Sequence, residues 1–314
     1  MTSVDGAARR VILRGGRVIV GDGHTVLDDA TVVVEHGRIT VVDTGDAPPS
    51  RPGDRHVDVS GKTVMPAVVN PHGHVGYMRG STTAAENFSR AGVLDYLRRI
   101  LYAGVATFQS LGTDRDDVEI GLRDQQGSGE LADEGPLVRF YSAGVGIVAP
   151  TPGSPNGGPF FSTESMFEAS TPQTREYLRT RIESIAPQPL FDTVEAYRRM
   201  VDAVHQYVEA GVRIVFSADT GLLTQVPGIA EHRELEAMVD AGVSTAETIH
   251  AATGRAAEFL GLDSGLVTEG RRADLLVLDA DPLTDIRAVR RIDSLYLDGD
   301  LVDRAALRDR FLDF

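Results

Sequence analysis

The sequence has no cysteine and only one lysine, Lys62, among its 31 basic residues. The absence of thiols excludes disulfides, thiolate metal sites and a cysteine nucleophile, and it is compatible with the cytoplasm. Basic residues are outnumbered by 46 acidic ones, so the formal net charge is −15. Because a non-specific nucleic-acid-binding protein needs a basic face, this charge argues against nucleic acid as a partner.

Long apolar runs are also missing. No stretch approaches the ~20 apolar residues that span a bilayer, and the polar N-terminus lacks the apolar core of a signal peptide. We therefore expect a soluble, cytoplasmic protein without a membrane partner. Its 314 residues, 42% of them apolar, are enough for one large domain or for one domain plus a smaller one.

One short apolar run ends in two histidines. Residues 64–69 are rich in β-branched side chains, which predicts a strand buried on both faces, as in a parallel α/β sheet. His72 and His74 follow at its C-terminal end. Residues i and i+2 of an extended segment point to the same side, so both imidazoles can converge on one metal ion, with Gly73 leaving room between them. The alternative is a pair of unrelated loop histidines.

The segments before this run indicate short strands at 11–14, 17–20, 30–34 and 38–42, separated by glycine-rich turns. They predict a small antiparallel sheet. At the other end of the chain, strands are expected at 265–270, 273–279 and 294–299. Because the N-terminal strands alone would expose one face of a small sheet, we expect the two ends to pair into one composite domain.

Strands and helices alternate between these ends. Helices are predicted at 87–102, from Asp114 to about residue 126, and at 173–185, 193–210, 231–241 and 245–260, the last interrupted by Gly254. Strands are predicted at 105–109, 137–141 and 212–217, and residues 149–172 form a Gly- and Pro-rich loop. A βαβα order predicts parallel strands.

Asp219 follows the predicted strand 212–217 as His72 and His74 follow theirs. In parallel α/β folds this end of the strands carries the chemistry. The alternative is a turn residue before Gly221 or a cap of the next helix. The other histidines are expected to be ordinary surface or helix-face residues: His24, His36, His56, His205, His232 and His250.

These motifs together resemble the amidohydrolase superfamily, in particular its imidazolonepropionase-like and prolidase-like members. The matching segments are 61–66 leading into His72-Gly73-His74, 104–107, 211–214 leading into Asp219-Thr220-Gly221, 251–253 with 260–262, 270–275 and 281–283. The resemblance implies a (β/α)8 barrel of TIM type with a small β-sandwich built from both termini. It assigns residues 8–64 with 265–304 to the sandwich and 65–264 to the barrel.

The same resemblance implies a site. In this family the His-x-His of the first barrel strand and the aspartate of the eighth bind one or two divalent metals, and the aspartate also accepts a proton from the attacking water. The residues that correspond are His72, His74 and Asp219. Zinc is the first choice of metal, because three protein ligands and a water are the ligand count of many catalytic zinc sites.

The chain departs from the family pattern in the middle. The family supplies further ligands there, a carboxylated lysine or glutamate and two histidines, whereas the only lysine of this chain precedes the first barrel strand. A full barrel takes ~200–250 residues, and only four strands are defensible between residues 66 and 262. We therefore expect an incomplete barrel, in sheet order eighth, first, second, third. Its open edges should dimerise, be covered by the 149–172 loop, or leave the protein unstable.

Three functions remain open from the sequence. The first is a metal-dependent hydrolase that cleaves a non-peptide C–N bond, amide or cyclic amide, of a small molecule. The second is a catalytically impaired or inactive remnant, and the third is a deaminase of an amino-heterocycle. The substrate itself has no readable code; Tyr77 and Arg79 are candidates for contacting a substrate carboxylate, although a solvated arginine explains Arg79 equally well.

Overall fold

The run that carries the two histidines divides between two sheets. In the computed structural model, residues 63–66 form strand β5 (Thr63–Pro66) and residues 68–73 form β6 (Val68–Gly73), so the single strand expected at 64–69 is wrong. Ala67 lies at the break, where its N–H bonds the carbonyl of Asp274. The structure describes residues 10–45, 48–79, 82–144, 194–221 and 225–312.

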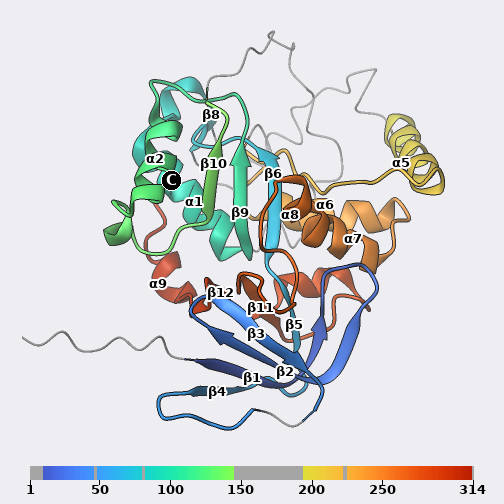
Figure 1. The fold of residues 1–314 in the computed structure, drawn as a ribbon. Helices are drawn as coiled ribbons and strands as arrows, with labels where there is room; N and C mark the ends of the chain where they lie inside the picture. Colours follow the sequence, from blue (N-terminus) through green and yellow to red (C-terminus); the bar gives the residue numbers. More distant parts are fainter. Residues whose placement is uncertain (1–9, 46–47, 80–81, 145–193, 222–224, 313–314) are drawn as a thin grey trace, which may run out of the picture. The chain divides into compact units, whose positions relative to one another are not determined.

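The described chain is an α/β protein, and it divides into two compact units. Unit 1 contains the residues up to Val69 together with Ser244–Asp303, and unit 2 contains Asn70–Val243 together with Arg304–Phe314. Each is described by itself (Figure 1).

Unit 1 contains strands from both ends of the chain. These are β1 (Val11–Ile19), β2 (Val26–Glu35), β3 (Arg38–Asp43), β4 (Arg55–Asp58), β5, β11 (Leu275–Leu278), β12 (Ile292–Leu297) and β13 (Asp300–Leu301). They form one eight-stranded sheet in the order β13-β12-β11-β5-β1-β2-β3, with β4 also pairing with β1. The expected pairing of the two ends is thus observed.

The sheet of unit 1 is mixed and not antiparallel as expected. β1 runs parallel to β4 and β5, whereas β11 is antiparallel to both β5 and β12. The predicted strands 11–14 and 17–20 are one strand, because the register shift beside Gly15, at φ +79°, is a β-bulge and not a turn. No strand forms at residues 265–270.

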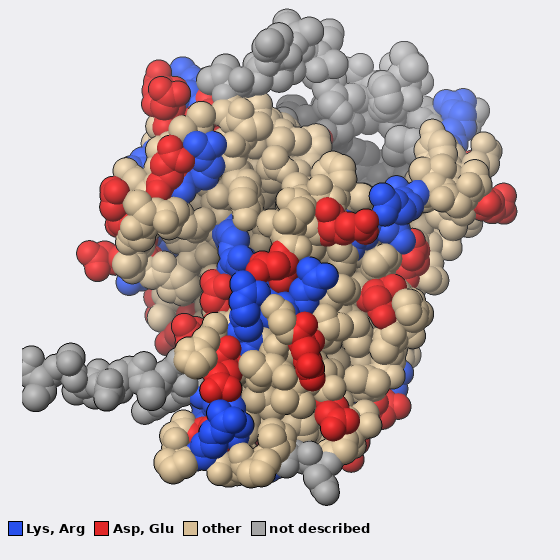
Figure 2. Space-filling view, viewed as in Figure 1, with Lys and Arg blue, Asp and Glu red and all other residues tan. Residues whose placement is uncertain are grey.

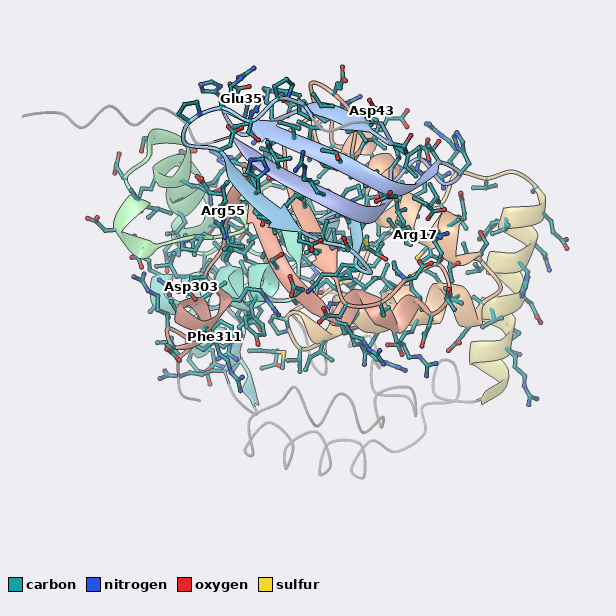
Figure 3. All side chains as sticks on the ribbon, turned by 90° about the horizontal axis from the view of Figure 1, so that it is seen from below. Arg17, Glu35, Asp43, Arg55, Asp303 and Phe311 are labelled. Carbon is teal, nitrogen blue, oxygen red and sulfur yellow. The ribbon has the colours of Figure 1, made fainter. Side chains whose placement is uncertain are left out.

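The core of unit 1 explains why the two ends associate. Alternate residues of β1 and β2, such as Leu13 and Val32, are buried in one cluster with Leu275, Val277 and Tyr296 from the C-terminal strands. The strands of either end alone would form a small sheet with one apolar face exposed to water. The polar residues Asp43 and Arg55 remain exposed on the strands (Figure 3). Three short helices complete the unit: α7 (Thr245–Ala252), α8 (Gly254–Phe259) and η4 (Ile286–Arg290).

Unit 2 is built on a three-stranded sheet in the order β10-β9-β6, with β9 at Val105–Ser110 and β10 at Arg139–Ser142. β10 is parallel to β9, as the βαβα order predicts. The remaining elements are the β7–β8 hairpin (Met78–Arg79, Thr82–Thr83), η1 (Ala85–Asn87), α1 (Arg90–Tyr102), α2 (Val118–Ser128), η2 (Ala132–Glu134), α5 (Val194–Glu209), α6 (Ile229–Asp240) and α9 (Arg304–Arg308).

The helices of unit 2 follow their sequence signals closely. α1 begins at Ser89, whose side chain accepts a hydrogen bond from Gly92 N, and it buries the apolar face that includes Val93, Leu97 and Ile100. The helix expected from Asp114 begins later, at Val118, but Asp114 accepts hydrogen bonds from Glu119 N and Ile120 N in its first turn. The ring of Phe311 packs on Tyr102, which fixes the C-terminal segment on α1 (Figure 3).

One strand prediction in unit 2 is wrong. Residues 212–217 contain no regular strand, and only Thr220 forms an isolated parallel bridge, to Gly73. This bridge brings Thr220 beside Gly73, the last residue of β6. The expected loop at 149–172 and helix at 173–185 lie outside the described residues. Among the described residues, no helix is long and apolar enough to cross a membrane.

Candidate metal centre

Strand β6 ends with His72 and Gly73, and His74 follows directly after it. The two rings are 5.4 Å apart between centroids and nearly perpendicular. Gly73 is required by packing on the opposite side, because a Cβ there would lie 2.5 Å from Cζ of Phe108 on β9. A glycine between the histidines therefore lets β6 lie close to the neighbouring strand.

Asp219 reaches the histidines because its own backbone lies against β6. The N–H of His74 donates to the carbonyl of Thr220 over 2.6 Å. Gly221, at φ +109°, allows this approach, since a Cβ at that position would overlap the carbonyl oxygen of His74. Asp219 itself has φ +48°, a left-handed conformation that aspartate tolerates better than most residues.

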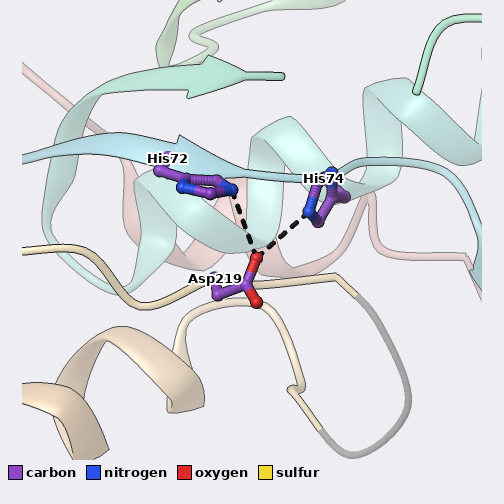
Figure 4. A group of neighbouring side chains, drawn as sticks. All are labelled: His72, His74 and Asp219. Carbon is purple, nitrogen blue, oxygen red and sulfur yellow. Dashed lines mark ion pairs between the residues drawn. The ribbon is translucent and has the colours of Figure 1, made fainter. Parts of the chain in front are cut away.

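The three side chains converge on one point (Figure 4). Asp219 Oδ1 lies 3.4 Å from His72 Nε2 and 3.0 Å from His74 Nε2. Each residue offers a ligand atom within 4.8 Å of the other two. The His72 and Asp219 side chains are 43% and 47% exposed, whereas that of His74 is 13% exposed, so water and a ligand can reach the group from one side.

These distances fit a small divalent cation. Ligand bonds of about 2.1 Å in a tetrahedron separate the ligand atoms by about 3.4 Å. Asp219 Oδ1 is buried, yet it makes no hydrogen bond within the described part of the chain, so neither imidazole contact has hydrogen-bond geometry. Three atoms with available lone pairs thus face one another, an arrangement that a cation satisfies. Three ligands also leave a fourth position open for water.

The surroundings of His72 favour its neutral form, which is the form that can bind a metal ion. Withdrawal from water lowers the pKa of His72 from 6.5, an effect that Asp219 opposes and that His74 reinforces. The ring is therefore neutral at neutral pH and can offer a lone pair.

On α6, burial and the nearby Asp219 raise the pKa of the Glu234 carboxyl to about 7.

A buried polar group that sequence reasoning missed lies behind the site. Glu231, on the first turn of α6, is fully buried, and burial raises its pKa despite several hydrogen bonds. It accepts bonds from Asn70 Nδ2, Thr220 Oγ1 and Gly228 N. The one available signal was a glutamate three residues after a glycine at a helix start, which resembles half of a capping box.

The remaining histidines are not brought to this point. On the helices, His232 contacts the carbonyl of Ala103 and His250 contacts that of Gly21, each at 2.8 Å. His56 is exposed and contacts Ser50. The single lysine, Lys62, forms ion pairs with Asp279 and Asp293 in unit 1.

The candidate substrate contacts differ in accessibility. Tyr77 donates its hydroxyl to the carbonyl of Thr113 over 2.7 Å and is partly buried. Arg79 is exposed on β7. On the face shown in Figure 2, acidic and basic side chains are interspersed.

Sequence comparison with known proteins gives matches over parts of the chain. The model of the amidohydrolase family matches residues 163–302. A 5-methylthioadenosine/S-adenosylhomocysteine deaminase of Symbiobacterium thermophilum is 39% identical over 66 residues, which are 21% of this chain and 15% of that relative. The match therefore spans only a small part of the curated relative.

Solved structures match over nearly the whole chain. A Bifidobacterium longum protein provisionally named a prolidase has a TM-score of 0.68 at 23% identity, covering 97% of this chain and 99% of that one. A Xaa-Pro dipeptidase with bound methionine gives 0.68 at 17%, covering 93% and 99%. Molinate hydrolase gives 0.66 at 16%, covering 96% of each. At these identities the likeness shows the fold alone.

The family match covers the segment that contains Asp219, and the shared fold extends over the segment that contains the two histidines. The match to the family model, which covers less than half of the chain, agrees with the resemblance of the motifs at both ends to the amidohydrolase superfamily.

Proposed function

We propose that this protein is a metal-dependent amidohydrolase that cleaves a non-peptide C–N bond, amide or cyclic amide, of a small molecule. The observation that carries the proposal is the convergence of His72, His74 and Asp219 at ligand distances. A divalent cation, zinc first, would polarise the substrate carbonyl and lower the pKa of a water molecule there.

The residues of the chain supply positioning and proton transfer. The two imidazoles and Oδ1 of Asp219 would hold the cation, and the other carboxylate oxygen of Asp219 would accept a proton from the attacking water. Asp219 then delivers that proton to the leaving nitrogen. Its exposure of 47% leaves room for a substrate beside it.

The finer fold assignment is part of the proposal. Residues 65–264 would form an incomplete TIM-type barrel, and residues 8–64 together with 265–304 would form a β-sandwich. The open edges would then be covered by self-association. A cytoplasmic location, with which the cysteine-free composition is compatible, is also part of the proposal.

Two other functions remain candidates. An inactive remnant is favoured by the middle of the sequence, where His205 is the only histidine between residues 141 and 212. A deaminase is favoured by the 66-residue match to a deaminase.

Metal analysis and a substrate panel separate these functions. We expect purified protein to contain close to one equivalent of zinc, manganese or iron, and expect His72→Ala and Asp219→Ala to lose both metal and turnover. His56→Ala, an exposed histidine outside the site, is the matched control. Release of an amine from N-acyl amino acids or ring opening of cyclic amides supports the hydrolase, and ammonia from an amino-heterocycle supports the deaminase.

The remaining outcomes count against catalysis. Metal without turnover on any member of the panel favours the remnant. Unchanged turnover in both His72→Ala and Asp219→Ala would end the metal-dependent proposal.

A further inference from the structure

Two segments far apart in the sequence supply the ligands, and one buried carboxylate lies between them. Asn70 precedes His72 by two residues on β6, and Thr220 follows Asp219 directly. Glu231 Oε1 accepts a bond from Asn70 Nδ2 at 3.0 Å and from Thr220 Oγ1 at 2.5 Å. A single oxygen therefore joins the His-x-His strand to the aspartate turn.

Both partners also contact the ligand backbone. Asn70 Oδ1 accepts the N–H of His72 at 3.2 Å, and the carbonyl of Thr220 accepts the N–H of His74 at 2.6 Å. The other carboxylate oxygen of Glu231 accepts Gly228 N at 2.7 Å, which fixes Glu231 at the start of α6. Glu231, Asn70 and Thr220 are all fully buried, so water cannot replace these bonds.

We infer that Glu231 is a positioning residue for the metal centre: it holds Asn70 and Thr220 together and thereby sets the distance between the two imidazoles and the carboxylate of Asp219. The inference rests on the proposed function, since it needs a metal at that point. Within the described part of the chain, no hydrogen bond joins Glu231 to the side chains of His72, His74 or Asp219, so it acts through Asn70 and Thr220.

The variants are chosen to separate positioning from general stability. Thr220→Val keeps the shape of the side chain and removes only the hydroxyl donor to Glu231. Glu231→Gln keeps the volume, but its amide nitrogen cannot accept the bond that one carboxylate oxygen accepts now. Glu119→Gln is the matched control, because Glu119 is also fully buried in unit 2 and accepts a hydroxyl bond, from Ser142, away from the ligand segments.

The zinc affinity of the purified full-length wild type and of each variant is measured by competition with a chromophoric chelator. The urea midpoint of each protein is measured without metal. Loss of an outer-shell contact typically weakens metal binding about 10–100-fold, and we expect this for Glu231→Gln and for Thr220→Val. Glu119→Gln should lower the urea midpoint with wild-type zinc affinity. Because Glu231 and Thr220 belong to one hydrogen-bond network, the double variant should lose less zinc affinity than the product of the two single losses.

Each failure has its own signature. If Glu231→Gln and Thr220→Val both bind zinc as the wild type does but have lowered urea midpoints, Glu231 is only a structural residue. That result overturns this inference and leaves the proposed function intact. If Glu231→Gln does not fold, Thr220→Val decides. A wild-type chain that binds no zinc, manganese or iron overturns the proposed function and this inference together.

Discussion

Replacing Gly221 by alanine tests whether the site depends on the close approach of two backbone segments. At φ +109° an alanine is strained, and its Cβ would overlap the carbonyl oxygen of His74. The turn must then move away from β6, which breaks the bond from His74 N to Thr220 O.

The cost follows from these two effects. A non-glycine residue in the left-handed region costs about 1–2 kcal/mol. Loss of one backbone hydrogen bond adds about 1 kcal/mol. Gly221→Ala should therefore destabilise the protein by about 2–3 kcal/mol in urea denaturation and, because Asp219 moves with the turn, weaken zinc binding by at least about tenfold, as does loss of an outer-shell contact.

Gly211→Ala is the matched control within unit 2. Gly211 has φ +71°, and a Cβ there would meet nothing within 4 Å, so only the conformational cost applies. We expect this variant to lose about 1–2 kcal/mol and to keep its zinc affinity. Equal stability of the two variants, together with equal zinc affinity, would refute the claim that the approach at Gly221 builds the site.

Three further predictions concern buried groups of unit 2. Tyr96→Phe removes the hydroxyl that accepts Met78 N at 2.9 Å, and leaving that buried donor unpaired should cost about 1–3 kcal/mol in urea denaturation. Gly73→Ala should weaken zinc binding because its methyl group meets the Phe108 ring, and Phe108→Leu in the same chain should restore part of the affinity. Burial raises the pKa of Glu119 above 4.5, so the folded state retains a proton that the unfolded state has lost, and the stability from this group falls as the pH rises. The stability of the wild type relative to Glu119→Gln should therefore be greatest below pH 4.5 and decline as the pH rises through the raised folded-state pKa, and a constant difference would contradict this assignment.

The positions of the candidate ligand side chains were predictable because the local sequence sets the direction in which they point. An extended segment puts His72 and His74 on one side whatever sheet it joins, and Asp219 follows an apolar segment as they do. That Asp219 lies beside the two histidines was implied by the resemblance to the amidohydrolase superfamily, in which the eighth barrel strand neighbours the first.

The wrong predictions share a different physical cause. Residues 64–69 and 212–217 have the composition of buried strands, but composition does not show where hydrogen bonding passes from one sheet to the next or stops. The break at Ala67 depends on its bond to Asp274, which lies in a distant part of the sequence. In the same way, β1 continues through Gly15 because a bulge accommodates that residue, although Gly15-Gly16 has the appearance of a turn.

Glu231 shows where sequence reasoning reaches its limit. A glutamate in the first turn of a helix is ordinarily exposed and interacts favourably with the helix dipole. Here it is fully buried because Asn70 and Thr220 donate to it from two other segments, and neither donor is near it in the sequence. Its burial is therefore a property of the assembled site. Burying a carboxylate costs free energy, and we expect such a group to be retained where it holds its hydrogen-bond donors in one geometry. The donors here, Asn70 and Thr220, lie beside all three candidate ligands.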